Sequence, residues 1–273
     1  MPTLDPYNIS DKLDDAVLDA IVTRLELRGK HPFFENMLRD YLDAMDIDKA
    51  DRVLDMGCGT GVAGRAIVHR KDFFGEVLGI DQSPYLVEAA NRFAVEEDLK
   101  GRARFVAGDT HSLDLEEGTF DAVVAHTLLS HVSDPLEVLG EAKRVAKPGA
   151  MIGIFDGDYA SLTFGQEDEA KWKADDEKII GAMVTQPRVM RQIPRLAKRV
   201  GFDLVKAFPY VLAEAGKADF WVPAIESLRT LLPKAGAMDQ PEAQAWADAQ
   251  LEASEQGVFF GASNFFGYVL RRR

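Results

Sequence analysis

The chain has 273 residues, 47% of them hydrophobic and 28% charged, which is typical of a soluble globular protein with one large domain or two small ones. Its net charge of −13 would repel a polyanion, so we expect no nucleic-acid partner, and its single cysteine, Cys58, excludes a disulfide framework. The acidic amino-terminal residues and the short apolar runs predict a cytoplasmic protein with neither a secretory signal nor a membrane span.

The first half of the chain predicts two helices followed by alternating strands and helices. The two helices lie between residues 10 and 46, where apolar residues recur at helical spacing with a break near 29–32. Strands are predicted at 52–56, 77–80, 103–106, 120–125 and 151–155, and helices at 62–70, from Pro84 onward behind a Ser83 cap, and at 135–146 behind Asp134. This alternation indicates a mostly parallel sheet covered on both faces.

The last third of the chain departs from simple alternation. A helix at 187–200 precedes a strand at 202–211, and a final strand is predicted at 259–270. Residues 217–257 between these strands read as helical and polar, with breaks at Pro223, Pro233 and Pro241. Two closing strands with a helical segment between them suggest a terminal antiparallel pairing.

Glycines follow the first predicted strand and open the next helix. Gly57, Gly59 and Gly61 would let backbone N–H groups approach a ligand where any side chain would clash. Gly59, Gly61 and Gly64 also satisfy the G-x-G-x-x-G fingerprint of dinucleotide-binding proteins. The loop therefore indicates a nucleotide site that either a dinucleotide or S-adenosylmethionine (SAM) could occupy.

Acidic residues at the ends of three strands help to separate these two ligands. Asp55 lies two residues before Gly57, where a dinucleotide would place its pyrophosphate, whereas SAM has no phosphate and carries an ammonium and a sulfonium. Asp81 could accept both hydroxyls of a ribose, which SAM and NAD share. Asp109, followed by Thr110, could accept the exocyclic amine of adenine.

Five motifs in order resemble the class I SAM-dependent methyltransferases, in particular the branch of the ubiquinone and menaquinone biosynthesis enzymes and their small-molecule relatives. The motifs are Val53-Leu-Asp-Met-Gly-Cys-Gly-Thr-Gly61, Gly79-Ile-Asp-Gln-Ser83, Gly108-Asp109, Phe120-Asp121 and Arg144-Val-Ala-Lys-Pro-Gly149. One departure is Ala150, where the family often has a second glycine.

The resemblance implies a Rossmann-like α/β fold with a seven-stranded, mostly parallel sheet, an antiparallel last strand, helices on both faces and added helical lid segments. Residues 1–48 would form amino-terminal helices that cover the site, and 49–273 would form the methyltransferase domain, with helical insertions at about 157–186 and 217–257. The substrate would be selected by these insertions.

The same resemblance implies SAM as cofactor and assigns residues to its parts. Asp55 with the glycine loop would hold the methionine part, Asp81 the ribose, and Asp109 with Thr110 the adenine, and Gln82 is a further cofactor-binding residue. His126 would stand beside the methionine end, and Arg28 would pair with the carboxylate of the cofactor.

Methyl transfer is an in-line displacement, so the enzyme mainly aligns the reacting atoms and needs a general base only for a nucleophile that keeps its proton. His126, His131 and Asp156 are the candidate catalytic residues, although His131 could instead orient its loop and Asp156 could cap its strand. No metal site is predicted.

Three functions remain open from the sequence. The leading one is a SAM-dependent methyltransferase acting on oxygen, nitrogen or carbon of a small molecule. A nicotinamide-dependent oxidoreductase is the rival enzyme, and a SAM-binding protein with a regulatory, non-catalytic role is the third reading. The sequence identifies neither the methyl acceptor nor the oligomeric state.

Overall fold

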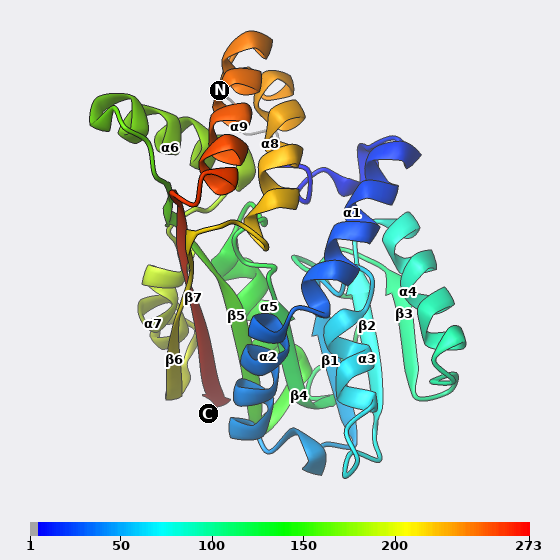
Figure 1. The fold of residues 1–273 in the computed structure, drawn as a ribbon. Coiled ribbons are helices and arrows are strands. Elements are labelled where there is room, and N and C mark those ends of the chain that lie inside the picture. The colour runs from blue at the N-terminus through cyan, green and yellow to red at the C-terminus, as the bar shows by residue number, and fades with distance from the viewer. Residues whose placement is uncertain (1–4) are drawn as a thin grey trace.

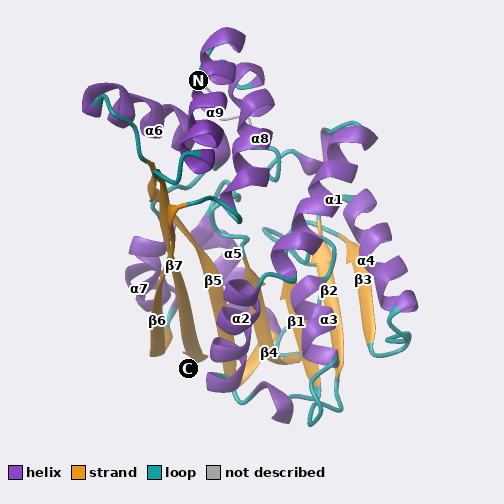
Figure 2. Ribbon diagram, in the orientation of Figure 1, coloured by secondary structure: helices purple, strands orange, loops and turns teal. Residues whose placement is uncertain are grey.

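A twisted seven-stranded sheet runs through the middle of the molecule in the computed structural model, which describes residues 5–273 (Figures 1 and 2). The strands in chain order are β1 (Arg52–Met56), β2 (Glu76–Asp81), β3 (Ala103–Ala107), β4 (Phe120–His126), β5 (Ala146–Phe164), β6 (Phe202–Gly216) and β7 (Phe259–Arg272). They lie in the order β3-β2-β1-β4-β5-β7-β6.

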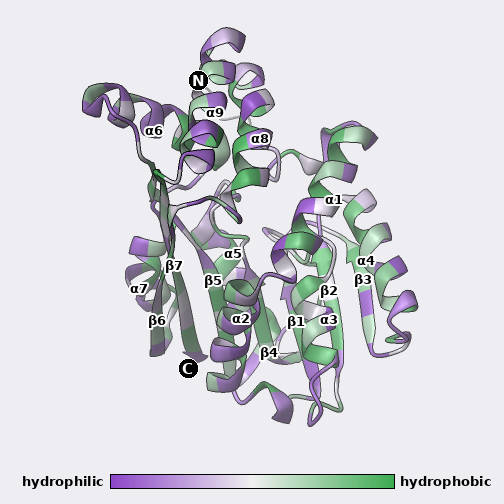
Figure 3. Cartoon of the chain, in the orientation of Figure 1, coloured by the Kyte–Doolittle hydropathy of each residue, from purple (hydrophilic) through white to green (hydrophobic). Residues whose placement is uncertain are grey.

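Helices cover both faces of this sheet. In chain order they are α1 (Asp15–Gly29), α2 (Pro32–Ala44), α3 (Val62–Val68), α4 (Pro84–Glu96), α5 (Pro135–Val145), α6 (Glu169–Met183), α7 (Val189–Val200), α8 (Trp221–Lys234) and α9 (Gln240–Glu255), with short 3₁₀ turns η1 (Ser10–Lys12) and η2 (Ile47–Lys49). Residues of α2, α3 and α4 share one buried cluster with the sheet, and residues of α5 and α7 share another. The predicted covering of both faces is confirmed, and Figure 3 shows apolar residues concentrated on the strands.

The topology agrees with the sequence prediction. Strands β1 to β5 pair in parallel, and β7 runs antiparallel to both of its neighbours, β5 and β6. β1 and β4 are adjacent, but α3 and α5, which follow them, lie on opposite faces. Such a switch point leaves a crevice beyond the carboxyl ends of the two strands, where α/β proteins bind ligands.

Two predicted helix caps are confirmed. The Ser83 side chain accepts a hydrogen bond from the backbone N–H of Leu86 at the start of α4, and Asp134 accepts from Leu136 and Glu137 at the start of α5. Each cap satisfies backbone donors that have no partner within the helix, which contributes about 1 kcal/mol to stability.

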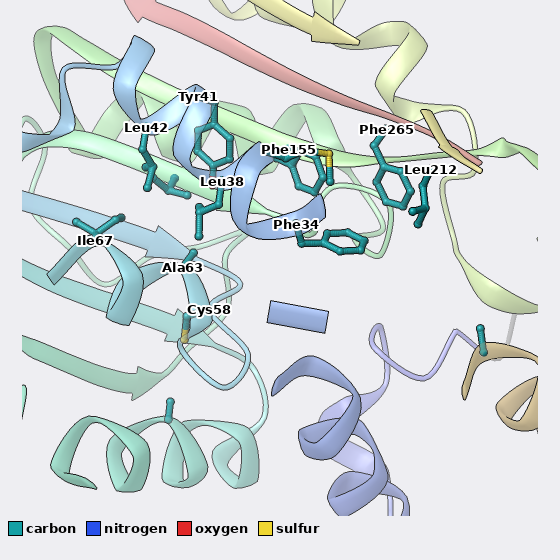
Figure 4. Packing of buried hydrophobic residues seen from close by; sticks show 14 of the residues in the cluster. Phe34, Leu38, Tyr41, Leu42, Cys58, Ala63, Ile67, Phe155, Leu212 and Phe265 are labelled. Atoms are coloured by element: carbon teal, nitrogen blue, oxygen red, sulfur yellow. The ribbon is translucent and has the colours of Figure 1, made fainter. Parts of the chain in front are cut away.

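The amino-terminal helix α2 packs over the middle of the sheet. Figure 4 shows its side chains Phe34, Leu38 and Tyr41 gathered beside Phe155 of β5 and Phe265 of β7. The rings of Phe34 and Phe265 lie 5.4 Å apart at nearly a right angle, an arrangement that favours aromatic pairs. Helix α2 is thus part of the main core.

The strand predicted at 151–155 is much longer in the structure and spans Ala146–Phe164. Thr163 and Phe164 pair with β7 beyond a register shift, so residues 157–164 are strand rather than the start of a helical insertion. β6 likewise continues past its predicted end to Gly216. Pairing with a long neighbouring strand decided these bounds, and local sequence patterns do not report it.

Helices α6, α8 and α9 form a separate layer above the ends of β5 and β7 (Figure 1). The break predicted at Pro223 is wrong, because this residue lies inside α8, whereas those predicted at Pro233 and Pro241 coincide with the end of α8 and the start of α9. Pro223 stands in the first turn, where its missing N–H has no acceptor within the helix. One face of this layer is apolar and buried, and the aromatic residues Phe164, Trp221 and Trp246 meet there.

Within residues 5–273, we find no helix with the length and apolar character that a membrane crossing requires. The cytoplasmic location stays a prediction.

The aromatic contacts around Phe164 predict a large stability cost for its removal. Phe164 is fully buried and its ring lies 5.3 Å from those of Trp221 and Trp246. We expect Phe164→Ala to lower the free energy of unfolding by about 3–5 kcal/mol, because it leaves a cavity between β5 and the helical layer. Denaturant titration measures this change. The exposed Phe74 supplies the control, since Phe74→Ala should change stability by less than about 0.5 kcal/mol. Equal effects of the two variants would contradict the packing described.

Candidate functional site

A pocket opens at the carboxyl ends of β1, β2, β3 and β4, in the crevice at the switch point between β1 and β4. On this side the wall is formed by residues of each strand end and the loop that follows it. They are Asp55 in β1 with Gly57, Cys58 and Gly59 after it, Asp81 at the end of β2 with Gln82 after it, Asp109, Thr110 and His111 after β3, and His126 at the end of β4 with Thr127, Leu128 and His131 after it. Almost all of the site residues predicted from the sequence therefore meet in one place. Gly61 and Asp156 are the two that lie outside the lining of this pocket.

The turn from β1 into α3 requires glycine at two positions. Gly57 and Gly61 have φ angles of +67° and +79°, which residues with a Cβ rarely adopt. A Cβ on Gly57 would come within 2.5 Å of Leu128, and one on Gly61 within 2.5 Å of the Phe105 ring. Gly61 thus serves the packing of the turn against β3, while Gly57 and Gly59 face the pocket.

Asp55 places a buried carboxylate at the floor of the pocket. Its Oδ2 accepts a hydrogen bond of 3.0 Å from the backbone N–H of Gly64, whereas Oδ1 is buried and has no partner among the described residues. Burial raises the pKa of Asp55 to about 7, assisted by the nearby charge of Asp81 and opposed by the Gly64 hydrogen bond. An unpaired buried oxygen of this kind is costly unless a donor or a cation occupies the pocket.

Asp81 and Gln82 connect the end of β2 to the glycine loop and to the amino-terminal segment. Asp81 accepts hydrogen bonds from the backbone N–H groups of Gly59 (2.8 Å) and Ser83 (3.0 Å), and burial raises its pKa. The Gln82 amide donates to the backbone carbonyl of Tyr7 (2.8 Å). Asp81 therefore fixes the loop and still lines the pocket, while Gln82 mainly holds the segment above it.

Asp109 and Thr110 stand at the outer edge of the pocket after β3. Thr110 is buried, whereas the Asp109 side chain is mostly exposed. Burial tends to raise the pKa of Asp109, but hydrogen bonds from the backbone and ring of His111, both 2.8 Å, lower it. One acceptor oxygen of Asp109 remains without a protein donor among the described residues.

His126 forms the wall at the end of β4. Its Nδ1 lies 3.0 Å from the hydroxyl of Tyr41, and its ring stacks on Phe155 at 4.8 Å. Burial, with the charge of Arg28, lowers the pKa of His126 to about 3, so the imidazole is neutral at ordinary pH. Arg28 itself lines the pocket and donates a hydrogen bond of 2.8 Å to Thr127 Oγ1.

Asp156 supports the loop after β4 from beneath. Its carboxylate accepts hydrogen bonds from the backbone N–H and hydroxyl of Ser130 (2.9 and 3.0 Å) and from the N–H of Gly157 (2.8 Å). It is fully buried and burial raises its pKa. This geometry favours the alternative reading of Asp156, a structural one, over direct contact with a substrate.

Several pocket residues had no signal in the sequence. Asn8, Ser10, Leu25 and Phe34 line the pocket from the amino-terminal side. They belong to no motif, and only the long-range contacts of their segment bring them to the site. The helical spacing of α1 and α2 predicted elements there but not which face would meet the ligand.

A family model described as a methyltransferase domain matches residues 47–216. An uncharacterized 37.1 kDa protein of transposon TN4556 from Streptomyces fradiae is 32% identical over 84% of this chain and 64% of its own length. The sterol 24-C-methyltransferase of Aspergillus fumigatus is 36% identical over 46% of this chain and 33% of its own length. The chain therefore spans less than two thirds of either relative.

Among solved structures, the same fold occurs in proteins with different names. The [4+2]-cyclase SpnF has a TM-score of 0.63 at 17% identity, with 100% of this chain and 98% of that chain covered. A putative sarcosine dimethylglycine methyltransferase from Galdieria sulphuraria has a TM-score of 0.56 at 18% identity, with 87% and 84% covered. At these identities the likeness shows the fold alone.

The hydrogen bonds of Asp156 predict a structural effect of its removal. Asp156→Ala leaves the N–H groups of Ser130 and Gly157 buried without an acceptor, so we expect the free energy of unfolding to fall by about 2 kcal/mol. Asp114 is exposed and makes no comparable contact, so Asp114→Ala is the control and should stay within about 0.5 kcal/mol. Denaturant unfolding that shows the same small loss for both variants would refute the supporting role.

Proposed function

Because the chain belongs to the family of class I SAM-dependent methyltransferases, we propose that it transfers the methyl group of SAM to an oxygen, nitrogen or carbon atom of a small molecule. The observation that carries this proposal is the unpaired Oδ1 of Asp55, buried at the floor of the pocket beside the glycine loop. SAM carries an ammonium and a sulfonium, and a buried carboxylate oxygen without a donor is suited to a cation.

The pocket offers a partner for each part of SAM. Asp55 and the N–H groups of Gly57 and Gly59 would hold the methionine part, and Arg28 would pair with its carboxylate. Asp81 would accept the ribose hydroxyls through its remaining lone pairs.

At the edge of the pocket, Asp109 would accept the amine of adenine, with Thr110 beside it. Bound SAM supplies an activated methyl carbon, so the protein's task is to align the acceptor with it. His126 lies at the end of β4 and lines the pocket. Its ring is uncharged, so it would contact the ligand without adding a charge to the pocket.

The rival oxidoreductase reading is disfavoured by the same carboxylate. A dinucleotide would bring its pyrophosphate to the turn that follows β1, where Asp55 is buried and its pKa is about 7. An anion there would force Asp55 to stay protonated or would face its charge. Gly59, Gly61 and Gly64 match the dinucleotide fingerprint, but the buried carboxylate of Asp55 disfavours binding of a dinucleotide there.

A SAM-binding protein without methyl transfer remains the second candidate. It is favoured by one observation: a structural neighbour that covers 100% of this chain, SpnF, is named a [4+2]-cyclase and not a methyltransferase. The fold therefore accommodates other roles, and only turnover separates the two readings. The names of the sterol and sarcosine enzymes support a small-molecule acceptor, without identifying it.

Binding of SAM and NAD by calorimetry tests the proposed cofactor. We expect the protein to bind SAM and not NAD. The Asp81→Asn variant should bind SAM with an affinity about 10- to 100-fold lower, because it loses charged hydrogen bonds to the ribose. Asp72→Asn is the control, since this exposed residue lies outside the pocket. Binding of NAD without SAM would overturn the proposal.

Turnover is tested by incubating the protein with SAM and a panel of quinols, phenols, amines and unsaturated sterols, followed by mass spectrometry. A mass gain of one methyl group on any acceptor, with S-adenosylhomocysteine formed in equal amount, is the expected result. SAM binding without methylation of any member would favour the non-catalytic reading.

The raised pKa of Asp55 predicts that SAM binding depends on pH. Because this pKa is about 7, the carboxyl group of the free protein is largely protonated at about pH 5.5 and must ionise to pair with the SAM ammonium. Affinity should therefore rise as pH increases through about 5.5 to 7, with protons released on binding. Calorimetry in buffers of different ionisation enthalpy measures that release. Asp55→Asn should bind SAM more weakly and lose this pH dependence, and an unchanged profile in the variant would refute the role of Asp55.

A further inference from the structure

The segment that precedes α1 crosses the side of the pocket and is anchored there by Asp5. This side chain is fully buried. Its oxygens accept hydrogen bonds from His131 Nδ1 (2.9 Å), from the backbone and hydroxyl of Thr185 (both 3.0 Å) and from the N–H groups of Tyr7 and Asn8. A buried carboxylate is costly without donors, so this full set of partners marks a specific docking point.

The contact with Asp5 fixes the orientation of the His131 ring. An ionised carboxylate can only accept hydrogen bonds, so His131 Nδ1 must carry the proton. The ring also lies 4.6 Å from that of Tyr7 and 6.3 Å from that of Tyr159. His131 lines the pocket, and within residues 5–273 no protein group is hydrogen-bonded to its Nε2. The lone pair of Nε2 is therefore left for a molecule in the pocket.

Of the three histidines that line the pocket, His126 and His131 have different surroundings. His126 is held by a tyrosine hydroxyl and its pKa is lowered to about 3, so it gains a proton only at strongly acidic pH. His131 faces acidic and phenolic groups instead. They are Asp5 and Tyr7 of the amino-terminal segment, Asp81 at the end of β2, and Asp156 and Tyr159 of β5. A carboxylate on Nδ1 stabilises the imidazolium that forms when Nε2 accepts a proton.

We propose, as a step that rests on the proposed function, that His131 Nε2 removes the proton of the methyl acceptor and that Asp5 is the positioning residue of this base. The acceptor's O–H or N–H bond breaks and its proton moves to Nε2. The freed electron pair forms the bond to the methyl carbon while the carbon–sulfur bond of SAM breaks, its electron pair remaining on sulfur. The imidazolium then returns its proton to water.

This assignment narrows the acceptor class and adds a condition for activity. The acceptor carries a hydroxyl or a protonated amine that keeps its proton at neutral pH, because only such a nucleophile needs a base. The base is complete only when the segment that carries Asp5 is docked at the pocket. Asp5 and His131 lie 126 positions apart in the sequence, so the docking of this segment is what brings them together.

Nuclear magnetic resonance of the histidine nitrogens tests the arrangement without any acceptor. The chain has five histidines, and His131→Gln identifies the signal of His131. At about pH 8, above the ordinary pKa of histidine, we expect the neutral tautomer with the proton on Nδ1. In Asp5→Asn the amide can donate as well as accept, so the Nε2-protonated tautomer should appear. Thr185→Val removes a different bond to Asp5 and should leave the tautomer unchanged. A doubly protonated ring, or a tautomer indifferent to Asp5→Asn, would overturn the proposal.

Kinetics with an acceptor from the phenol and amine panel separate a positioning role from a structural one. His131→Gln should lower kcat by about 10²-fold or more and Asp5→Asn by about 10-fold or more, with the KM for SAM unchanged. Added imidazole should restore part of the activity of His131→Gly. Equal kcat in His131→Gln and the unaltered protein, or a loss that lies only in KM, would refute the base.

The two proposals can fail separately. Absence of SAM binding in the unaltered protein refutes the proposed function whatever the tautomer of His131. SAM binding and methylation that persist in His131→Gln refute only the base.

Discussion

The turn between β1 and α3 is the constraint on which the site depends. It passes so close to Phe105 and Leu128 that Cβ atoms at Gly61 and Gly57 would lie 2.5 Å from these side chains. The close approach brings the N–H of Gly59 onto Asp81, and that of Gly64 onto Asp55. The turn thus joins β1, β2 and the loop after β4 into one floor, and its backbone orients the carboxylates of Asp55 and Asp81.

Local patterns in the sequence were sufficient to predict the helices and strands and many of the residues that form the floor of the pocket. The caps Ser83 and Asp134 act over a few residues, so their neighbours in sequence predicted them. The strand-end acids Asp55 and Asp81 were predicted from their places in the motifs, although Asp81 accepts a hydrogen bond from Gly59, 22 positions away in the chain. The length of β5 and the docking of Asp5 were not predictable in this way. Each depends on partners far along the chain: β7 for the former, His131 and Thr185 for the latter. Asp156 illustrates the same limit, since its position after a strand suggested chemistry and its three donors show support of a loop.

The charges of the pocket have a consequence for the two forms of the proposed cofactor. Asp55 and Asp81 are both buried, and burial raises the pKa of each. A cationic ligand relieves this cost more than a neutral one. Methyl transfer removes the positive charge from sulfur, so the proposed product would meet the same carboxylates with a smaller attraction. The pocket is therefore electrostatically suited to hold the donor more firmly than what remains of it.

The place of β7 in the sheet bears on the order in which the molecule can be completed during synthesis. Within the described part of the chain, β6 pairs only with β7, and β7 is inserted between β5 and β6 although it follows both in the chain. While a ribosome is still adding residues before Phe259, β6 has no neighbour in the sheet and the far edge of β5 stays open. Such an unpaired strand is a site for wrong association. The nascent chain therefore passes through a vulnerable interval that ends only when its final strand emerges.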